Sequence, residues 1–231
     1  MSEYLDIIEA KAVATIRKNA PTSAPYYLAF SGGKDSVVLE HLAKVSGCNY
    51  EMHYSMTSVD PPEVLQFIRR EYPQCIRHKP AKTMRDIIIE KKMLPSRRIR
   101  FCCQYLKETG GEGRVCLVGI RREESQQRAS REMIEVVGKK LNIHPIIEWD
   151  SSDIWGYIKY KNIKTCKLYK EGFKRLGCVG CPMLCRKERQ KQFERWPQFK
   201  RAYMSAIINI FERRNDNFTS PEEMFEWWLD Q

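Results

Sequence analysis

The stretch YYLAFSGGKDS, residues 26–36, decides the fold of this chain. Residues 26–30 form a short apolar and aromatic run that is typical of a buried strand. A Ser-Gly-Gly turn follows, and residues 36–44 then place apolar side chains at helical spacing. Glycines let a backbone approach an anion closely, and a helix N-terminus directs free N–H groups and a positive dipole end at it. The stretch therefore predicts a phosphate-binding loop made of Ser31, Gly32, Gly33, Lys34, Asp35 and Ser36.

The side chains of this loop suit a polyphosphate. Lys34 adds a positive charge, Ser31 and Ser36 add hydroxyl donors, and Asp35 either orients the loop or helps to hold Mg²⁺. A Walker A loop requires G-x-x-x-x-G-K-[ST], whereas Asp35 follows Gly33-Lys34 here. P-loop kinases and GTPases are excluded, and an ordinary Gly-rich strand-to-helix turn is the alternative.

Outward from the loop, strand and helix patterns alternate, which predicts an α/β fold with a mainly parallel, twisted sheet flanked by helices. We expect strands over 50–56, 115–120 and 143–148, and helices over 4–18, 61–71, 83–91, from about 130, and 152–160. Asp60 is expected as the N-cap before Pro61, and Ser220 as another helix start. The last 45 residues look helical. We therefore expect two domains, an α/β domain over 1–185 that includes the cysteine pairs and a helical C-terminal extension over 186–231.

The composition fits a folded, basic protein. The chain has 231 residues, 42% of them hydrophobic, and a net charge of +11. We expect a cytoplasmic protein, because no apolar run approaches the roughly 20 residues of a membrane helix. The charge favours nucleotides, sulfonucleotides or nucleic acid as partners, with a merely basic, solvated surface as the alternative.

Nine cysteines, an odd number, argue against a complete disulfide framework. Two pairs stand out, Cys102-Cys103 and the C-x-x-C motif of Cys178 and Cys181. Four thiolates suit zinc or an iron–sulfur cluster. Tandem cysteines fit a compact tetrahedral zinc site poorly, so a cluster is favoured and zinc is the alternative. The isolated cysteines at 48, 75, 116 and 166 are expected in the core, and Cys185 is an additional candidate ligand.

These motifs resemble known families. SGGKDS resembles the signature of the PP-loop, or N-type ATP pyrophosphatase, superfamily, whose fold is adenine nucleotide alpha hydrolase-like. Residues 119–125, GIRREES, followed by Arg128, resemble the G-[IL]-R-x-x-E-S-x-x-R segment of PAPS reductase-like proteins. The cysteine pairs resemble those of the iron–sulfur sulfonucleotide reductases. The resemblance extends from about residue 26 to residue 204.

The resemblance implies roles for particular residues. It places Thr57 and Gly119 with the phosphate loop at the nucleotide, and it makes Lys34, Asp35, Arg121 and Arg128 the catalytic candidates. It implies a 4Fe–4S cluster held by Cys102, Cys103, Cys178 and Cys181. Tyr169 and Arg175, in a run that resembles L-Y-x-x-G-F-x-R-x-G-C, either touch substrate or serve packing and surface charge.

Two functions follow from these residues. PP-loop enzymes cleave ATP between the α- and β-phosphates and transfer AMP to a substrate oxygen, and an intact loop favours ATP itself. No cysteine follows Cys185, where a sulfonucleotide reductase has its nucleophile. We therefore expect an ATP pyrophosphatase or sulfurtransferase that adenylates a substrate, with Mg²⁺, for sulfur transfer. A phosphoadenosine phosphosulfate or adenylylsulfate reductase is the first alternative, and a non-catalytic nucleotide- or DNA-binding module with a structural cluster is the second.

The expected partners follow from this reading. They are ATP or a sulfonucleotide, a nucleic-acid substrate, and a sulfur donor such as a cysteine desulfurase, or else thioredoxin. A second copy of the chain in a homodimer is a further expectation. The basic segment 186–201 either packs its aromatic residues on the core or contacts nucleic acid.

Overall fold

The computed structural model describes residues 2–213 and 218–231. The strands are β1 (Tyr26–Ala29), β2 (Tyr50–Ser55), β3 (Ile76–His78), β4 (Val115–Val118), β5 (Ile134–Val137) and β6 (Lys140–Ile143). The helices are α1 (Ser2–Lys18), α2 (Lys34–Ser46), α3 (Pro62–Glu71), α4 (Met84–Lys91), α5 (Phe101–Leu106), α6 (Gln126–Ala129), α7 (Ser151–Tyr160), α8 (Arg186–Arg195), α9 (Pro197–Phe211) and α10 (Pro221–Leu229), with 3₁₀ turns η1 (Arg122–Glu124) and η2 (Lys167–Tyr169). The predicted α/β class with C-terminal helices is confirmed.

The strands form one sheet in the order β3-β2-β1-β4-β6-β5. β1 pairs in parallel with β2 on one side and with β4 on the other, and β5 pairs antiparallel with β6. The chain therefore leaves β1 towards β2 and later returns to the opposite side of β1 for β4. In such sheets ligands bind beside the carboxyl ends of the strands where the order reverses. The predicted phosphate loop follows β1 at this position.

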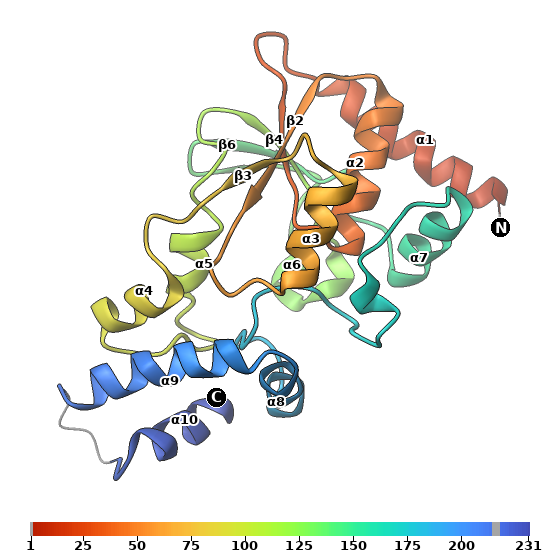
Figure 1. Cartoon of the computed structure of the whole chain (residues 1–231). Coiled ribbons are helices and arrows are strands. Elements are labelled where there is room, and N and C mark those ends of the chain that lie inside the picture. Colours follow the sequence, from red (N-terminus) through yellow and green to blue (C-terminus); the bar gives the residue numbers. More distant parts are fainter. Residues whose placement is uncertain (1, 214–217) are drawn as a thin grey trace. The chain divides into compact units, whose positions relative to one another are not determined.

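Helices α1, α2 and α7 pack against one another beside the sheet (Figure 1). The predicted helical spacing accounts for α1, because Leu5, Ile8, Ala12 and Ile16 are all buried. In α2 the residues Val37, Val38, Leu39 and Leu42 are buried as well. This packing fixes α2, and with it the helix N-terminus that follows the Ser-Gly-Gly turn.

The described chain divides into two compact units, each assembled from separate segments. The first consists of residues 1–54, 63–78 and 110–176, and the second of residues 55–62, 79–109 and 177–231. The sheet and the phosphate loop belong to the first unit, and both cysteine pairs belong to the second. Neither unit is a continuous stretch of sequence. The expected division into domains over 1–185 and 186–231 concerns parts that fold independently, and it stays a prediction.

The second unit has an aromatic core of its own. The rings of Tyr203 and Trp228 lie 4.9 Å apart between centroids, and those of Phe193 and Phe225 lie 5.5 Å apart. Trp228 also donates from Nε1 to the carbonyl oxygen of Pro95 at 2.7 Å. The aromatic residue Phe193 of the basic segment 186–201 thus packs on the core, as the first of its two interpretations expected.

Three local predictions are wrong. Residues 134–143 form the β5–β6 hairpin rather than a helix, because Gly138 takes a φ of +61° at the turn and the flanking residues pair as strands. The strand expected over 143–148 ends at Ile143. Helix α3 begins at Pro62, one residue later than expected, and the carboxylate of Asp60 accepts from the N–H and hydroxyl of Thr57 instead of capping that helix.

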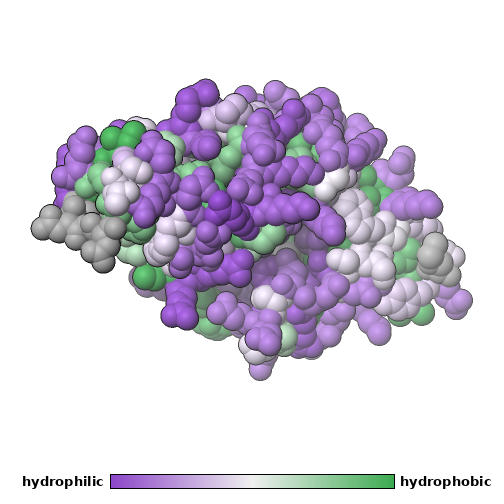
Figure 2. Space-filling view, turned by 90° about the horizontal axis from the view of Figure 1, so that it is seen from below, coloured by the Kyte–Doolittle hydropathy of each residue, from purple (hydrophilic) through white to green (hydrophobic). Residues whose placement is uncertain are grey.

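The face shown in Figure 2 is mainly hydrophilic, with smaller apolar areas between the polar side chains. This agrees with a chain in which 30% of the residues are charged. Among the described residues, no helix is long and apolar enough to cross a membrane.

Candidate nucleotide and cysteine sites

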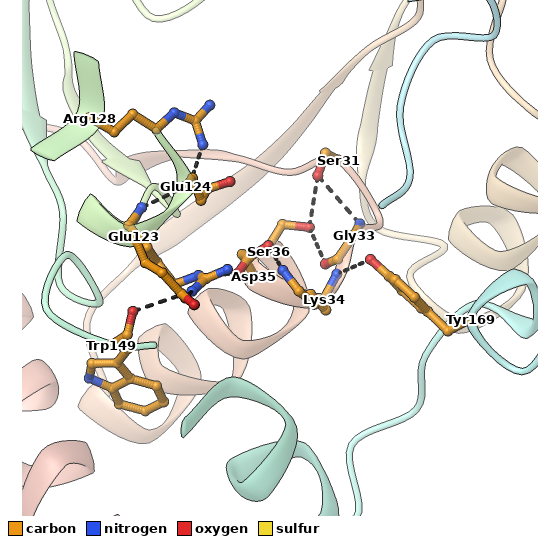
Figure 3. A network of polar contacts seen from close by, with 11 residues as sticks. Ser31, Gly33, Lys34, Asp35, Ser36, Glu123, Glu124, Arg128, Trp149 and Tyr169 are labelled. Carbon is orange, nitrogen blue, oxygen red and sulfur yellow. Dashed lines mark hydrogen bonds and ion pairs between the residues drawn. The ribbon is translucent and has the colours of Figure 1, made fainter. Parts of the chain in front are cut away.

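The phosphate loop makes a tight turn into α2. Gly32 has a φ of +70°, and a Cβ there would lie 3.1 Å from Ile68. The N-cap of α2 is Gly33, whose N–H donates to Ser31 Oγ at 3.3 Å. Ser36 Oγ donates back to the carbonyl oxygen of Gly33 at 2.9 Å and accepts from Ser31 Oγ at 3.2 Å (Figure 3). The hydroxyls fix the turn, and no side chain in the described part of the chain caps the helix.

Charges of alternating sign continue from the loop. Lys34 Nζ lies 2.7 Å from Asp35 Oδ2, and Asp35 Oδ1 accepts from Arg121 Nε at 2.6 Å. Arg121 also pairs with Glu123 at 2.5 Å, and its side chain is only 3% exposed. The structure therefore brings together three of the predicted catalytic residues, Lys34, Asp35 and Arg121, at the N-terminus of α2.

Gly119 and the residues after β4 form the other side of this region. A Cβ on Gly119 would lie 3.2 Å from the carbonyl oxygen of Asp35, so β4 approaches the first turn of α2 closely. Glu124 accepts from the backbone N–H of Arg121 at 2.9 Å and forms an ion pair with Arg128 (Figure 3). Gly119 thus lies beside the first turn of α2, and Arg128 is connected to Arg121 through Glu124.

One backbone N–H donor of the phosphate loop is already hydrogen-bonded to Tyr169. The backbone N–H of Lys34 donates to the Tyr169 hydroxyl at 2.7 Å, so this phenol lies where an anion oxygen would bind (Figure 3). The ring packs edge-on against Trp155, with centroids 5.0 Å apart. Burial raises the pKa of Tyr169, so the phenol stays protonated and keeps its own O–H for a second partner.

Thr57 was predicted to lie at the nucleotide. It belongs to the second unit, where Cys178 Sγ lies 3.4 Å from its hydroxyl. Its backbone N–H and its hydroxyl both donate to Asp60, at 2.6 and 2.8 Å. Within its own unit, Thr57 is therefore a neighbour of the cysteine motif.

The predicted cysteine ligands gather in the second unit. Cys102 and Cys103 lie in α5, and Cys178 and Cys181 in the loop before α8; all are free thiols. A hydrogen bond with Cys103 raises the pKa of Cys102, and the charges of Cys178 and Cys181 raise it further. The same bond from Cys102 lowers the pKa of Cys103, and Arg100, which donates to Cys103 Sγ at 3.3 Å, lowers it as well.

The loop that carries Cys178 and Cys181 is tightly held. The N–H of Val179 donates to Val59 O at 2.8 Å, and the N–H of Gly180 donates to Gln192 Oε1 at 2.9 Å. Gly180 has a φ of +75°, and a Cβ there would come within 2.6 Å of Phe193. Tyr203 donates to Val179 O at 3.1 Å. The ligand loop is therefore positioned by α8 and α9 of its own unit.

The donor chemistry of this unit fits a cluster with net negative charge. Besides Arg100, the unit supplies Lys107, and the negative charge of Cys178 raises the pKa of that ammonium. Within the described residues, however, no group of three or more His, Cys, Asp or Glu side chains is placed to hold a metal ion. Cys185 is exposed, and its thiol lies 3.4 Å from Glu188 at the start of α8. The metal therefore remains a proposal.

The sheet order, the glycine turn and the helix that begins at Lys34 together define a nucleotide-binding protein of the PP-loop type. The Phosphoadenosine phosphosulfate reductase domain family matches residues 25–184, and this chain belongs to that family. The predicted family is confirmed.

Curated relatives agree with this assignment. An uncharacterised protein of Methanocaldococcus jannaschii is 28% identical over 223 residues, which cover 86% of this chain and 46% of the relative. An adenosine 5'-phosphosulfate reductase of Oceanobacillus iheyensis is 25% identical over 181 residues, covering 73% of this chain and 75% of that protein. The chain spans less than half the length of the M. jannaschii relative.

Solved structures show the same fold. The phosphoadenylyl-sulfate reductase of Candida auris, in a phosphate complex, has a TM-score of 0.55 at 18% identity, over 77% of this chain and 95% of that one. The FMN adenylyltransferase of Candida glabrata, in complex with FAD and inorganic pyrophosphate, has a TM-score of 0.54 at 17% identity, over 77% and 63% of the two chains.

Proposed function

We propose that this chain is an ATP-binding PP-loop enzyme of sulfur metabolism that adenylates a substrate and prepares it for sulfur transfer. The observation that carries the proposal is the complete phosphate loop. The first turn of α2, the ammonium of Lys34 and the carboxylate of Asp35 lie together at the reversal of the strand order. This is a combination of amide donors, cation and metal-binding carboxylate that suits a polyphosphate with Mg²⁺.

In the proposed reaction a substrate oxygen attacks the α-phosphorus of ATP. The bond from that phosphorus to the oxygen bridging the α- and β-phosphates breaks, and pyrophosphate leaves. Lys34 and the α2 amides stabilise the charge on the leaving pyrophosphate. Asp35, oriented by Arg121, would hold Mg²⁺, and Arg128 would exchange its ion pair with Glu124 for a contact with a phosphate oxygen. A sulfur nucleophile then attacks the adenylated atom, and AMP leaves.

We further propose that Cys102, Cys103, Cys178 and Cys181 hold a 4Fe–4S cluster, with zinc as the alternative. The thiols interact within one unit beside Arg100 and Lys107, and cationic neighbours suit a cluster that carries net negative charge. When bound, such a cluster would supply electron or sulfur chemistry. Net charge +11 supports a nucleic acid as that substrate.

A sulfonucleotide reductase is the second candidate, because several relatives are named adenosine 5'-phosphosulfate reductases. Residues 186–231 contain no cysteine. For such a reaction we propose the thiol of Cys185, or that of a partner such as thioredoxin, as the nucleophile.

Ligand specificity separates the candidates. Anaerobically purified protein is titrated with ATP–Mg²⁺, PAPS and APS, and pyrophosphate and sulfite are measured. We expect ATP–Mg²⁺ to bind best and Lys34→Ala to weaken it at least tenfold, since a charge-assisted contact is lost. Lys44→Ala, at the exposed far end of the same helix, is the matched control and should leave binding unchanged.

Two outcomes contradict this proposal. Sulfite release from PAPS or APS with thioredoxin, together with indifference to ATP, identifies a reductase. Tight ATP binding without pyrophosphate release in the presence of tRNA or DNA identifies a non-catalytic binding module.

A further inference from the structure

Arg189 is a buried guanidinium with unused donors. Arg189 lies on α8 and is 1% exposed. Its Nη2 donates to the carbonyl oxygen of Trp228 at 3.0 Å and to that of Leu229. The ring of Trp228 covers the guanidinium at 4.9 Å. Nε and Nη1 are equally buried, and neither has a hydrogen-bond partner among residues 2–213 and 218–231. Buried donors are nearly always satisfied, so these two point to an acceptor outside the chain's own polar groups.

The surroundings of Arg189 favour an anionic acceptor. Burial lowers the pKa of Arg189, and the charge of Arg97 lowers it further, whereas the Cys181 thiolate raises it. Arg97 itself donates from Nε to the carbonyl oxygen of Pro182, the residue after Cys181, at 3.1 Å. The carboxylate of Asp230, which also interacts with Arg189, pairs with Arg186 at 2.7 Å. Arg97 thus lies beside the residue that follows Cys181, and the charge of Arg189 interacts with that of Cys181, whereas the carboxylate of Asp230 is paired with Arg186.

The face of α8 that carries Arg189 is directed at the ligand loop. Arg189, Gln192 and Phe193 are the buried residues of this helix. Gln192, one turn after Arg189, accepts from Gly180 N–H at 2.9 Å, and Phe193 lies against Gly180. Residues three apart on a helix share a face. Arg189 is therefore on the side of α8 that contacts the segment between Cys178 and Cys181.

We propose that Nε–H and Nη1–H of Arg189 donate hydrogen bonds to sulfur atoms of the iron–sulfur cluster on its Cys181 side. The inference rests on the proposed cluster and adds a residue that tunes it. Hydrogen bonds and positive charge at cluster sulfurs favour the more negative, reduced state and raise the reduction potential. Through Nη2 the same guanidinium binds the last carbonyls of α10, so α10 holds the donor in place.

The test is the midpoint potential of the cluster, followed by EPR, together with iron and sulfide content. Arg189→Lys keeps the charge but loses the fork of donors. We expect this variant to retain the cluster and to have a lower midpoint potential. At a fixed applied potential, the ratio of reduced to oxidised cluster should fall by about tenfold, which is the effect expected from the loss of one charge-assisted hydrogen bond. Arg189→Gln is measured beside it, so that a usable variant remains if the lysine substitution prevents folding.

Arg186→Gln is the matched control. Arg186 lies on the same helix and also binds α10, through Glu226 and Asp230, but it is on the exposed side. Its loss should reduce stability without moving the potential. If the Arg189 variants keep the wild-type potential, or shift it no more than Arg186→Gln does, Arg189 only anchors α10 and the inference is wrong.

The inference about Arg189 can fail while the proposed cluster stands, which is the case if the Arg189 variants keep the wild-type potential. Wild-type protein with zinc, or without iron and sulfide, overturns both the proposed cluster and the role of Arg189. ATP binding, measured on the same preparation, then shows whether the rest of the proposed function stands.

Discussion

At the scale of single residues, the charged side chains at the phosphate loop already form ion pairs with one another. Lys34 pairs with Asp35, and Asp35 pairs with Arg121. A polyphosphate would compete with Asp35 for the ammonium, unless a divalent cation occupies the carboxylate and releases Lys34 to the phosphates. The arrangement thus predicts that nucleotide and Mg²⁺ bind in a cooperative manner, because each removes a competitor of the other.

A substitution at Gly119 tests whether the close approach of β4 to α2 positions the phosphate loop. Gly119→Ala places a Cβ 3.2 Å from the backbone oxygen of Asp35, which can yield only by moving the start of α2. We expect ATP binding to weaken about tenfold and the free energy of unfolding to fall by about 1–3 kcal/mol, as for overpacking. Calorimetric titration and urea denaturation measure the two effects.

Gly177→Ala is the control for this substitution, because a Cβ there would have no atom of the described residues within 4 Å. Equal behaviour of the two alanine variants would show that the approach of β4 is not what positions the loop.

The sequence was sufficient to predict most of the residues at the loop, because glycine, lysine and serine at fixed spacing act through the local backbone. Partners that depend on distant segments were harder to identify. Glu123 and Glu124, which hold Arg121, lie far from the loop in sequence, and only the sheet brings them there. For Tyr169 the sequence is compatible with either a substrate contact or helix packing, and the bond that its hydroxyl accepts from Lys34 N–H depends on how η2 is positioned.

At the scale of elements, helix α7 shows how local signals fix a boundary. Asp150 Oδ1 accepts from Asp153 N–H at 2.8 Å, and Asp153 Oδ2 accepts from Asp150 N–H at 3.0 Å, which completes a capping box. The helix predicted over 152–160 follows Asp150 and Ser151, and both residue types are favoured as N-caps. The helix from residue 130 was mispredicted because IEVVGKKLNI also alternates as a hairpin, and pairing with β4 decides between the two.

Asp150 provides a pH-dependent prediction. The backbone N–H of Asp153 and the hydroxyl of Ser152 lower the pKa of Asp150. A carboxyl with a lowered pKa in the folded state stabilises the protein above its unfolded pKa of about 4, and this stability is lost as the pH falls further. Asp150→Ala should therefore cost about 1 kcal/mol at pH 7, typical of an N-cap, and less at pH 3.

Urea denaturation at the two pH values measures this difference. Asp150→Asn, a neutral N-cap, should differ from wild type by a smaller amount at pH 7. A gap between wild type and Asp150→Ala that is as large at pH 3 as at pH 7 would rule out the charge of Asp150 as its cause.

At the scale of the whole molecule, both units draw on segments far apart in the chain. We expect a chain that ends at residue 185 to lose the support of the C-x-x-C loop, because Gln192 and Tyr203 bind Gly180 and Val179. The thiols of Cys178 and Cys181 should then react faster with a thiol reagent. Reaction rates, followed residue by residue by mass spectrometry, measure this effect.

The buried Cys116, in β4 of the first unit, is the internal control and should stay protected in the shortened chain. Unchanged rates at Cys178 and Cys181 would support the expected boundary at residue 185, with the cysteine loop held by residues 1–185 alone.

The interleaving of the two units also has a consequence during synthesis. Cys103, the second of the tandem pair, leaves the ribosome 75 residues before Cys178, which at about 5–20 residues per second is a delay of roughly 4–15 s. In that interval the last strand of the sheet, β6, and helix α7 are already made, whereas α8, with Arg189 and Gln192, is not. The nascent chain can thus complete its sheet first, and the early thiols wait for the late ones before any ligand can be shared among them.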